Sequence, residues 1–200
     1  MKLKKESSVL VIGQHLVSRT EAIRDYLLEK SYRPYVVSLA SVFIDKKENY
    51  LLYYRDASSK KGCVLRHNIL KRIKTRQIIV IATFLFYIWD IMCALIIFRR
   101  RFELYIGISH FFGLSGIFLK SLGICKKSIY YAIDYYLPPQ GCGIFDAALV
   151  RISNFADKMA VIYSDEVWDI SSRIADGRLK FSGIGKEFYA HKNRIVPLGY

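Results

Sequence analysis

Four short polar segments follow apolar runs of strand length in this 200-residue chain, and their residue types are suited to chemistry. They are Gly13-Gln14-His15, Ser109-His110, Asp134-Tyr135 and Ser164-Asp165. If the apolar runs form parallel strands, ligands bind just beyond the carboxyl ends of those strands. Two imidazoles, a carboxylate and several hydroxyls would then face one cleft, where they could bind a hydroxylated substrate and move a proton.

Asp134 is the candidate catalytic residue, because a carboxylate directly after an apolar strand can accept a hydrogen bond from a substrate hydroxyl and help to remove its proton. The alternative is a structural loop anchor. The candidate substrate-binding residues are Gly13, Gln14, His15, His110, Tyr135 and Ser164. A lone histidine is more often satisfied by backbone carbonyls, and no GxGxxG pattern follows Gly13, so turn chemistry remains open there. The four cysteines form no CxxC pair, so no metal site is predicted.

These segments need elements to position them, and the chain alternates between strand-like and helix-like patterns. Strands are predicted over 9–12, 35–39, 50–54, 103–109, 128–133, 158–164 and 194–197, and helices over 19–30, 78–98, 111–122, 144–156 and 165–174. Strands and helices that alternate in this way are typical of a parallel sheet with crossover helices. The sequence therefore predicts an α/β, Rossmann-like fold with helices on both faces of the sheet, formed by residues 1–200 as one domain.

The predicted helix over 78–98 is long and apolar, and at 1.5 Å per residue it reaches about 30 Å. Asp90 near its middle, and a polar or small stripe formed with Thr83, Tyr87 and Ala94, favour a helix packed on a sheet or lying at a membrane interface. A true membrane span is the alternative.

The charge is strongly basic: 31 Lys and Arg residues against 17 Asp and Glu residues give a formal net charge of +14. No acidic residue occurs between Ala57 and Trp89. Such a chain is expected to work against an anionic surface, either membrane lipid or nucleic acid. The basic residues adjoin an apolar helix, and no helix-turn-helix, RRM or zinc motif is present, so an anionic membrane surface is the expected partner and nucleic-acid binding the less favoured alternative.

Three passages resemble the GT-B glycosyltransferases of family four: SIYYAIDYYLP (128–138), ADKMAVIYSDEVWD (156–169) and NRIVPLGY (193–200). The first resembles a strand that ends in an Asp-Tyr pair. The second resembles an alanine-aspartate, strand, serine, helix passage, and the third the stretch that leads into the C-terminal domain. The family often carries a histidine just before the aspartate, where this chain has Ile133.

The resemblance implies a fold and a function. It implies the acceptor-side, N-terminal domain of a glycosyltransferase that acts in cell-envelope polysaccharide synthesis, peripheral to the cytoplasmic face of the membrane. The acceptor would be a lipid-linked or other glycan, and no cofactor is expected in these residues. The nucleotide-sugar donor would bind a second domain or a partner chain, so these residues alone should transfer no sugar. The alternative within the same fold is a non-catalytic, membrane-anchoring subunit.

Overall fold

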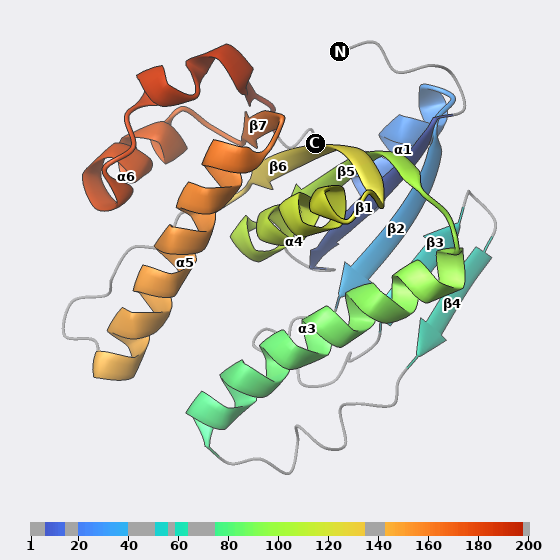
Figure 1. The fold of residues 1–200 in the computed structure, drawn as a ribbon, viewed down its shortest axis with the longest axis horizontal. Helices are drawn as coiled ribbons and strands as arrows, with labels where there is room; N and C mark the ends of the chain where they lie inside the picture. Colours follow the sequence, from blue (N-terminus) through green and yellow to red (C-terminus); the bar gives the residue numbers. More distant parts are fainter. Residues whose placement is uncertain are drawn as a thin grey trace. The chain divides into compact units, whose positions relative to one another are not determined.

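The structure is a computed structural model, and it describes residues 7–14, 20–39, 51–55, 59–63, 75–134 and 143–197. The chain divides into two compact units, Met1–Arg101 and Phe102–Tyr200, which are taken in turn. Figure 1 labels their helices and strands.

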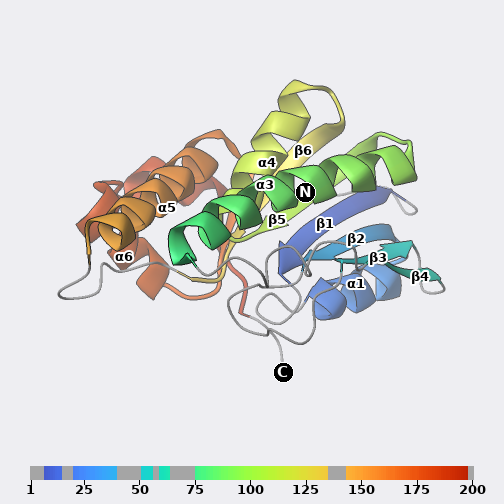
Figure 2. The same ribbon diagram turned by 90° about the horizontal axis from the view of Figure 1, so that it is seen from below.

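The first unit is a sheet with a helix on each face. Its elements are β1 (Ser8–Gln14), α1 (Thr20–Glu29), β2 (Arg33–Leu39), β3 (Leu51–Arg55), β4 (Ser59–Cys63) and α3 (Arg76–Phe98). The strand order is β4-β3-β2-β1. β1 and β2 are parallel, whereas β3 and β4 add to β2 as antiparallel strands. Helix α1 lies on one face of these strands and α3 on the other (Figure 2).

The second unit is built on four parallel strands. Its elements are β5 (Phe102–Ile108), α4 (His110–Ser121), β6 (Cys125–Ala132), α5 (Ile144–Tyr163), β7 (Glu166–Asp169), α6 (Arg173–Ser182), the 3-10 turns η1 (Lys186–Phe188) and η2 (Ala190–Lys192), and β8 (Asn193–Ile195). The strand order is β5-β6-β7-β8, and each neighbouring pair is parallel. An α/β fold with parallel strands is therefore confirmed, and it is consistent with a Rossmann-like architecture.

The most strongly apolar runs of the sequence form strands because their side chains are buried in the cores of the two units. The apolar run Val9–Ile12 is fully buried in β1, as expected of a strand covered on both faces. The β6 residues Tyr130 and Ala132 are likewise fully buried, and they join Ala160 of α5 and Val167 of β7 in the core of the second unit. Burial on this scale is what holds each sheet together.

Two predicted elements near the C-terminus are wrong. The segment over 158–164 is not a strand, because helix α5 continues to Tyr163. The segment over 165–174 is not one helix, since it contains the short strand β7 and only the start of α6. The run Met159–Tyr163 is apolar and β-branched enough to suit either state, and periodicity cannot separate them over so few residues. Burial of Ala156, Asp157, Ala160 and Val161 shows the helical spacing that prevailed.

The predicted long helix is confirmed as α3, a single helix of 23 residues. Within the part of the chain that is described, no helix is both long enough and apolar enough to cross a membrane.

Candidate functional site

A sharp turn carries the chain from the carboxyl end of β5 into helix α4. Ser109 forms this turn with φ 84° and ψ 156°, a conformation that costs a residue with a side chain about 1–3 kcal/mol. Its N–H donates to the carbonyl of Tyr131 (2.9 Å), and its carbonyl accepts from the N–H of Gly113 (2.9 Å). A Cβ on Gly107 would lie 2.3 Å from the carbonyl oxygen of Phe112, so the first turn of α4 packs directly against β5.

His110, the first residue of α4, is held by this turn at the carboxyl edge of the sheet, but its side chain is only 4% exposed. Its Nδ1 lies 3.4 Å from the Ser109 hydroxyl, and its ring centroid lies 4.3 Å from that of Phe111. Burial lowers the imidazole pKa to about 4, an effect that the negative charge of Asp157 partly opposes. His110 is therefore neutral at pH 7, and a substrate cannot reach it without local movement.

Asp134 lies two residues beyond the end of β6, at the same edge, and its side chain is exposed. The two strands are in register, with Ile108 opposite Tyr131, so the turn at Ser109 and the segment that ends in Asp134 leave the sheet side by side. Partial desolvation raises the pKa of the Asp134 carboxyl above its usual value. An accessible carboxylate with a raised pKa is a better proton acceptor than an ordinary aspartate.

Of the other predicted site residues, Gly13 and Gln14 belong to the first unit, and His15 and Tyr135 lie outside the described residues. Gly13 is buried in β1 of the first unit, opposite Ser38 of β2, and the backbone of Gln14 ends the same strand. The side chain of Gln14, and the whole of His15 and Tyr135, lie outside the described residues. The four predicted segments were expected to share one cleft. In the second unit the structure brings together Ser109, His110 and Asp134.

The prediction that Ser164 follows a strand is wrong. Ser164 ends helix α5 and precedes β7, so it lies at the amino end of that strand, opposite the edge that carries Asp134. Its hydroxyl is buried and has no hydrogen-bond partner among the described residues. Its carbonyl accepts from the ammonium of Lys192 (2.8 Å), which also reaches the carbonyl of Ile162 and so satisfies the end of α5. This position fits a helix terminus better than a substrate contact.

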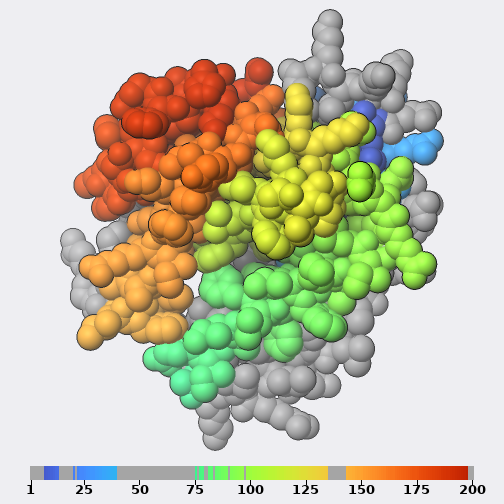
Figure 3. All heavy atoms as spheres, viewed as in Figure 1, coloured from blue at the N-terminus to red at the C-terminus, as the bar shows by residue number. Residues whose placement is uncertain are grey.

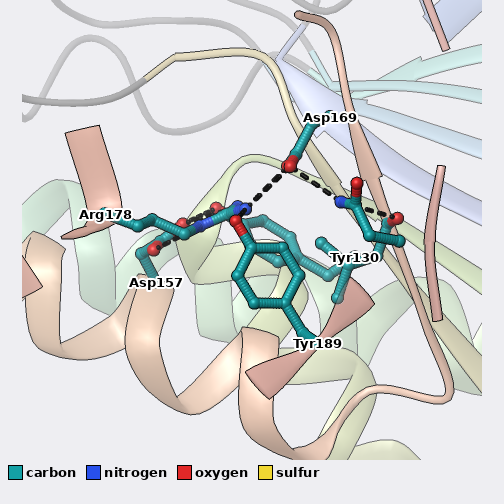
Figure 4. A network of polar contacts seen from close by, with 7 residues as sticks. Tyr130, Asp157, Asp169, Arg178 and Tyr189 are labelled. Atoms are coloured by element: carbon teal, nitrogen blue, oxygen red, sulfur yellow. Dashed lines mark hydrogen bonds and ion pairs between the residues drawn. The ribbon is translucent and has the colours of Figure 1, made fainter. Parts of the chain in front are cut away.

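A buried polar network lies beside the predicted edge, and Arg178 of α6 is at its centre (Figure 4). The guanidinium Nε and Nη2 donate to the two carboxylate oxygens of Asp157 (2.9 and 3.1 Å), and Nη1 donates to both oxygens of Asp169 (2.8 and 2.9 Å). The Tyr189 hydroxyl accepts a further hydrogen bond from Nη1 (3.2 Å). The Tyr130 hydroxyl donates to Asp157 (2.6 Å), and the Asn193 amide donates to Asp169 (2.8 Å).

The network joins α5, β7, α6, the 3-10 turns and β8 into one body. Burial raises the pKa of the Asp169 carboxyl, while the neighbouring guanidinium and the Asn193 amide oppose that shift. Burial alone would lower the pKa of Arg178, but Asp157, Tyr130 and Asp169 together raise it above its usual range, so the guanidinium stays charged. Because Arg178 and Asp169 are fully buried and bonded to each other, the group is closed to substrate, and removing one partner would leave an uncompensated buried charge.

Sequence reasoning missed this network. Asp157 and Asp169 lie inside the passage 156–169 that resembles the GT-B glycosyltransferases, but nothing in the sequence marks Arg178 as their partner. The predicted order of elements in the passage 156–169 is wrong. In the structure the passage runs from helix through serine to strand, and not from strand through serine to helix.

The end of β8 is tied to the same edge of the sheet. The Tyr131 hydroxyl donates to the carbonyl of Val196 (2.6 Å), and the Val196 N–H donates to the carbonyl of Asp169 (2.8 Å). Asp134, the Ser109 turn and the segment that contains Val196 therefore all emerge where the parallel strands end. In comparisons with known proteins, the chain matches no family model and no curated protein.

Proposed function

We propose that this chain provides the acceptor-side domain of a glycosyltransferase, with Asp134 as the residue that assists the attacking hydroxyl. The observation that supports the proposal is an exposed carboxylate at the carboxyl edge of four parallel strands, the place where open α/β sheets bind ligands. The resemblance of passages 128–138 and 193–200 to the family-four GT-B enzymes supplies the reaction class.

Asp134 would accept the proton of an acceptor hydroxyl as that oxygen attacks the donor sugar. Its raised pKa strengthens it as a base, and general-base assistance of this kind is typically worth 10²- to 10⁴-fold in rate. Ile133 is buried at the preceding position, so no imidazole is available there for the same task. His110, neutral and buried, is better placed to support the Ser109 turn than to touch the acceptor.

The donor nucleotide sugar would bind a second Rossmann-like domain, in the same protein or in a partner chain, because transfer needs donor and acceptor held together. The acceptor would be a lipid-linked or other glycan at the cytoplasmic face of the membrane. The net charge of +14 supports peripheral association with an anionic leaflet.

The test uses membranes from the native cells, supplied with radiolabelled nucleotide sugars. Deletion of the gene should remove one labelled, lipid-extractable product, and the wild-type gene should restore it. Asp134→Asn should reduce the initial rate about 10²-fold or more. The control is Asp176→Asn, an exposed aspartate of α6, and it should restore the wild-type rate. A deletion that changes no labelled product would contradict the proposal, and full activity of Asp134→Asn would favour the non-catalytic subunit.

A further inference from the structure

Helix α3 carries large apolar side chains on the side that faces away from its own unit. Seven of them are between 47% and 63% exposed, and we call them the outer stripe: Ile78, Ile81, Leu85, Ile88, Trp89, Met92 and Ile96. With about 100° of rotation per residue, they fall within an arc of about 100° and extend over about 27 Å of helix. Figure 3 shows side chains of α3, coloured teal to green, on the molecular surface along most of the helix.

Helix α3 contacts β2 of its own unit, and its buried residues lie opposite the outer stripe. Tyr87, Ile91 and Ala94 are buried on the opposite side of α3, and the ring of Phe98 packs edge-on against Tyr35 of β2, with centroids 5.1 Å apart. The outer stripe is therefore exposed because the helix already uses its other side for the core. An apolar surface of this extent on a protein usually marks an interaction site.

The residues that flank α3 in the sequence are basic. Arg99, Arg100 and Arg101 follow the helix directly and are exposed. The guanidinium of Arg100 lies 5.1 Å from the ring centroid of Tyr35 and donates to its hydroxyl, which anchors this basic cluster to the unit. Before the helix in the sequence, residues 60–76 contain seven Lys and Arg residues and no acidic residue. An occupant of the stripe must therefore tolerate positive charge at both ends.

This charge pattern argues against a second copy of the chain. In the sequence, basic residues both precede and follow the helix, so either a parallel or an antiparallel pair of α3 helices would bring like charges together. Such contacts disfavour association. An anionic bilayer offers what the stripe and its ends require: apolar chains for the side chains, phosphates for the arginines, and an interfacial region suited to Trp89.

We propose that α3 lies in the plane of an anionic bilayer, with the outer stripe among the upper acyl chains and Arg99–Arg101 at the level of the lipid phosphates. This proposal deepens the proposed function by naming the surface that holds the domain at the membrane, and it rests on that function only for the location of the acceptor. The stripe and its basic ends would exist whichever reaction the domain serves.

The experiment is cosedimentation of the full chain with vesicles of phosphatidylcholine alone, or with about 30% phosphatidylglycerol. Wild type should bind the anionic vesicles and bind the neutral ones weakly. Leu85→Glu/Ile88→Glu changes two exposed stripe residues and should weaken binding about tenfold or more. The matched control, Tyr26→Glu/Leu179→Glu, adds the same charge at exposed apolar positions on α1 and α6 and should bind within about twofold of wild type.

Three results would overturn the proposal: equal binding of wild type to neutral and anionic vesicles, unchanged binding of the stripe variant, or a dimer in light scattering that the stripe variant abolishes. Circular dichroism confirms that each variant is folded. Failure of the proposed function is separable, because Asp134→Asn should lose sugar transfer and still bind vesicles. The stripe variant should lose vesicle binding and keep transfer to an acceptor dispersed in detergent.

Discussion

Arg178 and the outer stripe of α3 are both unusual in their exposure to solvent, because arginine is rarely buried and large apolar side chains are rarely exposed together. In the second unit the guanidinium of Arg178 is fully buried, and in the first unit the seven large apolar side chains of the outer stripe are exposed. The two differ in how their surroundings satisfy them. Arg178 has Asp157, Asp169 and Tyr189 as hydrogen-bond partners within its own unit, whereas the stripe faces away from the core that α3 helps to form.

This difference predicts that changes to the Arg178 network affect the stability of the fold, whereas changes to the outer stripe affect binding to a partner. A buried charge whose partners all belong to the fold should affect unfolding when it is changed. An exposed apolar surface makes little contribution to folding, so changing it should affect association with something outside the chain.

Arg178→Met should give the largest effect, since it leaves two buried carboxylates facing each other without a counter-charge. We expect the free energy of unfolding in urea to fall by about 3–5 kcal/mol at pH 7. Arg173→Met, at an exposed position of the same helix, should change it by about 0.5 kcal/mol or less. A loss below about 1 kcal/mol for Arg178→Met would show that the network does not hold this unit together.

His110 should have the next largest effect on the free energy of unfolding, and this effect should depend on pH. The unfolded imidazole takes up a proton near pH 6.5 and the folded one only near pH 4, so the unfolded state binds more protons between these values. Stability should therefore fall as the pH falls, by up to about 1.4 kcal/mol per pH unit in this interval. His110→Gln should remove this component, whereas the exposed His191→Gln should retain it. Parallel pH profiles for wild type and His110→Gln would contradict the prediction.

The stripe should give the smallest effect on stability. Without vesicles, Leu85→Glu/Ile88→Glu should change the free energy of unfolding by about 1 kcal/mol or less, because both positions are exposed and glutamate is a good helix former. Urea titration followed by circular dichroism measures it. A loss as large as that of Arg178→Met would mean that the stripe belongs to the core after all.

The sequence predicted the elements whose patterns are local and strong. The buried run Val9–Ile12, the helices α1 and α4, and the strands β5 and β6 all form where apolar spacing and flanking turns placed them. Strand β4 was missed because its sequence, SKKGC, has no apolar alternation, and it forms by pairing with β3. Strand β7 has four residues, which is too short for a period to be read.

The candidate site was predictable only in part. Asp134 could be found because it directly follows a strongly apolar strand, and the sheet register then places it beside the Ser109 turn. The Arg178 network could not, because its charged partners come from α5 and β7, and tertiary packing alone brings them to α6. Burial of His110 was likewise invisible, since it depends on how closely α4 packs against β5 at Gly107.

The claim that a bilayer completes the outer stripe is tested most directly by the fluorescence of Trp89. The chain has two tryptophans, so the measurement uses Trp168→Phe, which keeps a ring beside Tyr131 in β7. On anionic vesicles, Trp89 emission should shift to shorter wavelength, and bromine high on the acyl chains should quench it more than bromine near the chain ends. Emission that no brominated lipid quenches, or that bromine near the chain ends quenches most strongly, would contradict an in-plane helix at the bilayer interface.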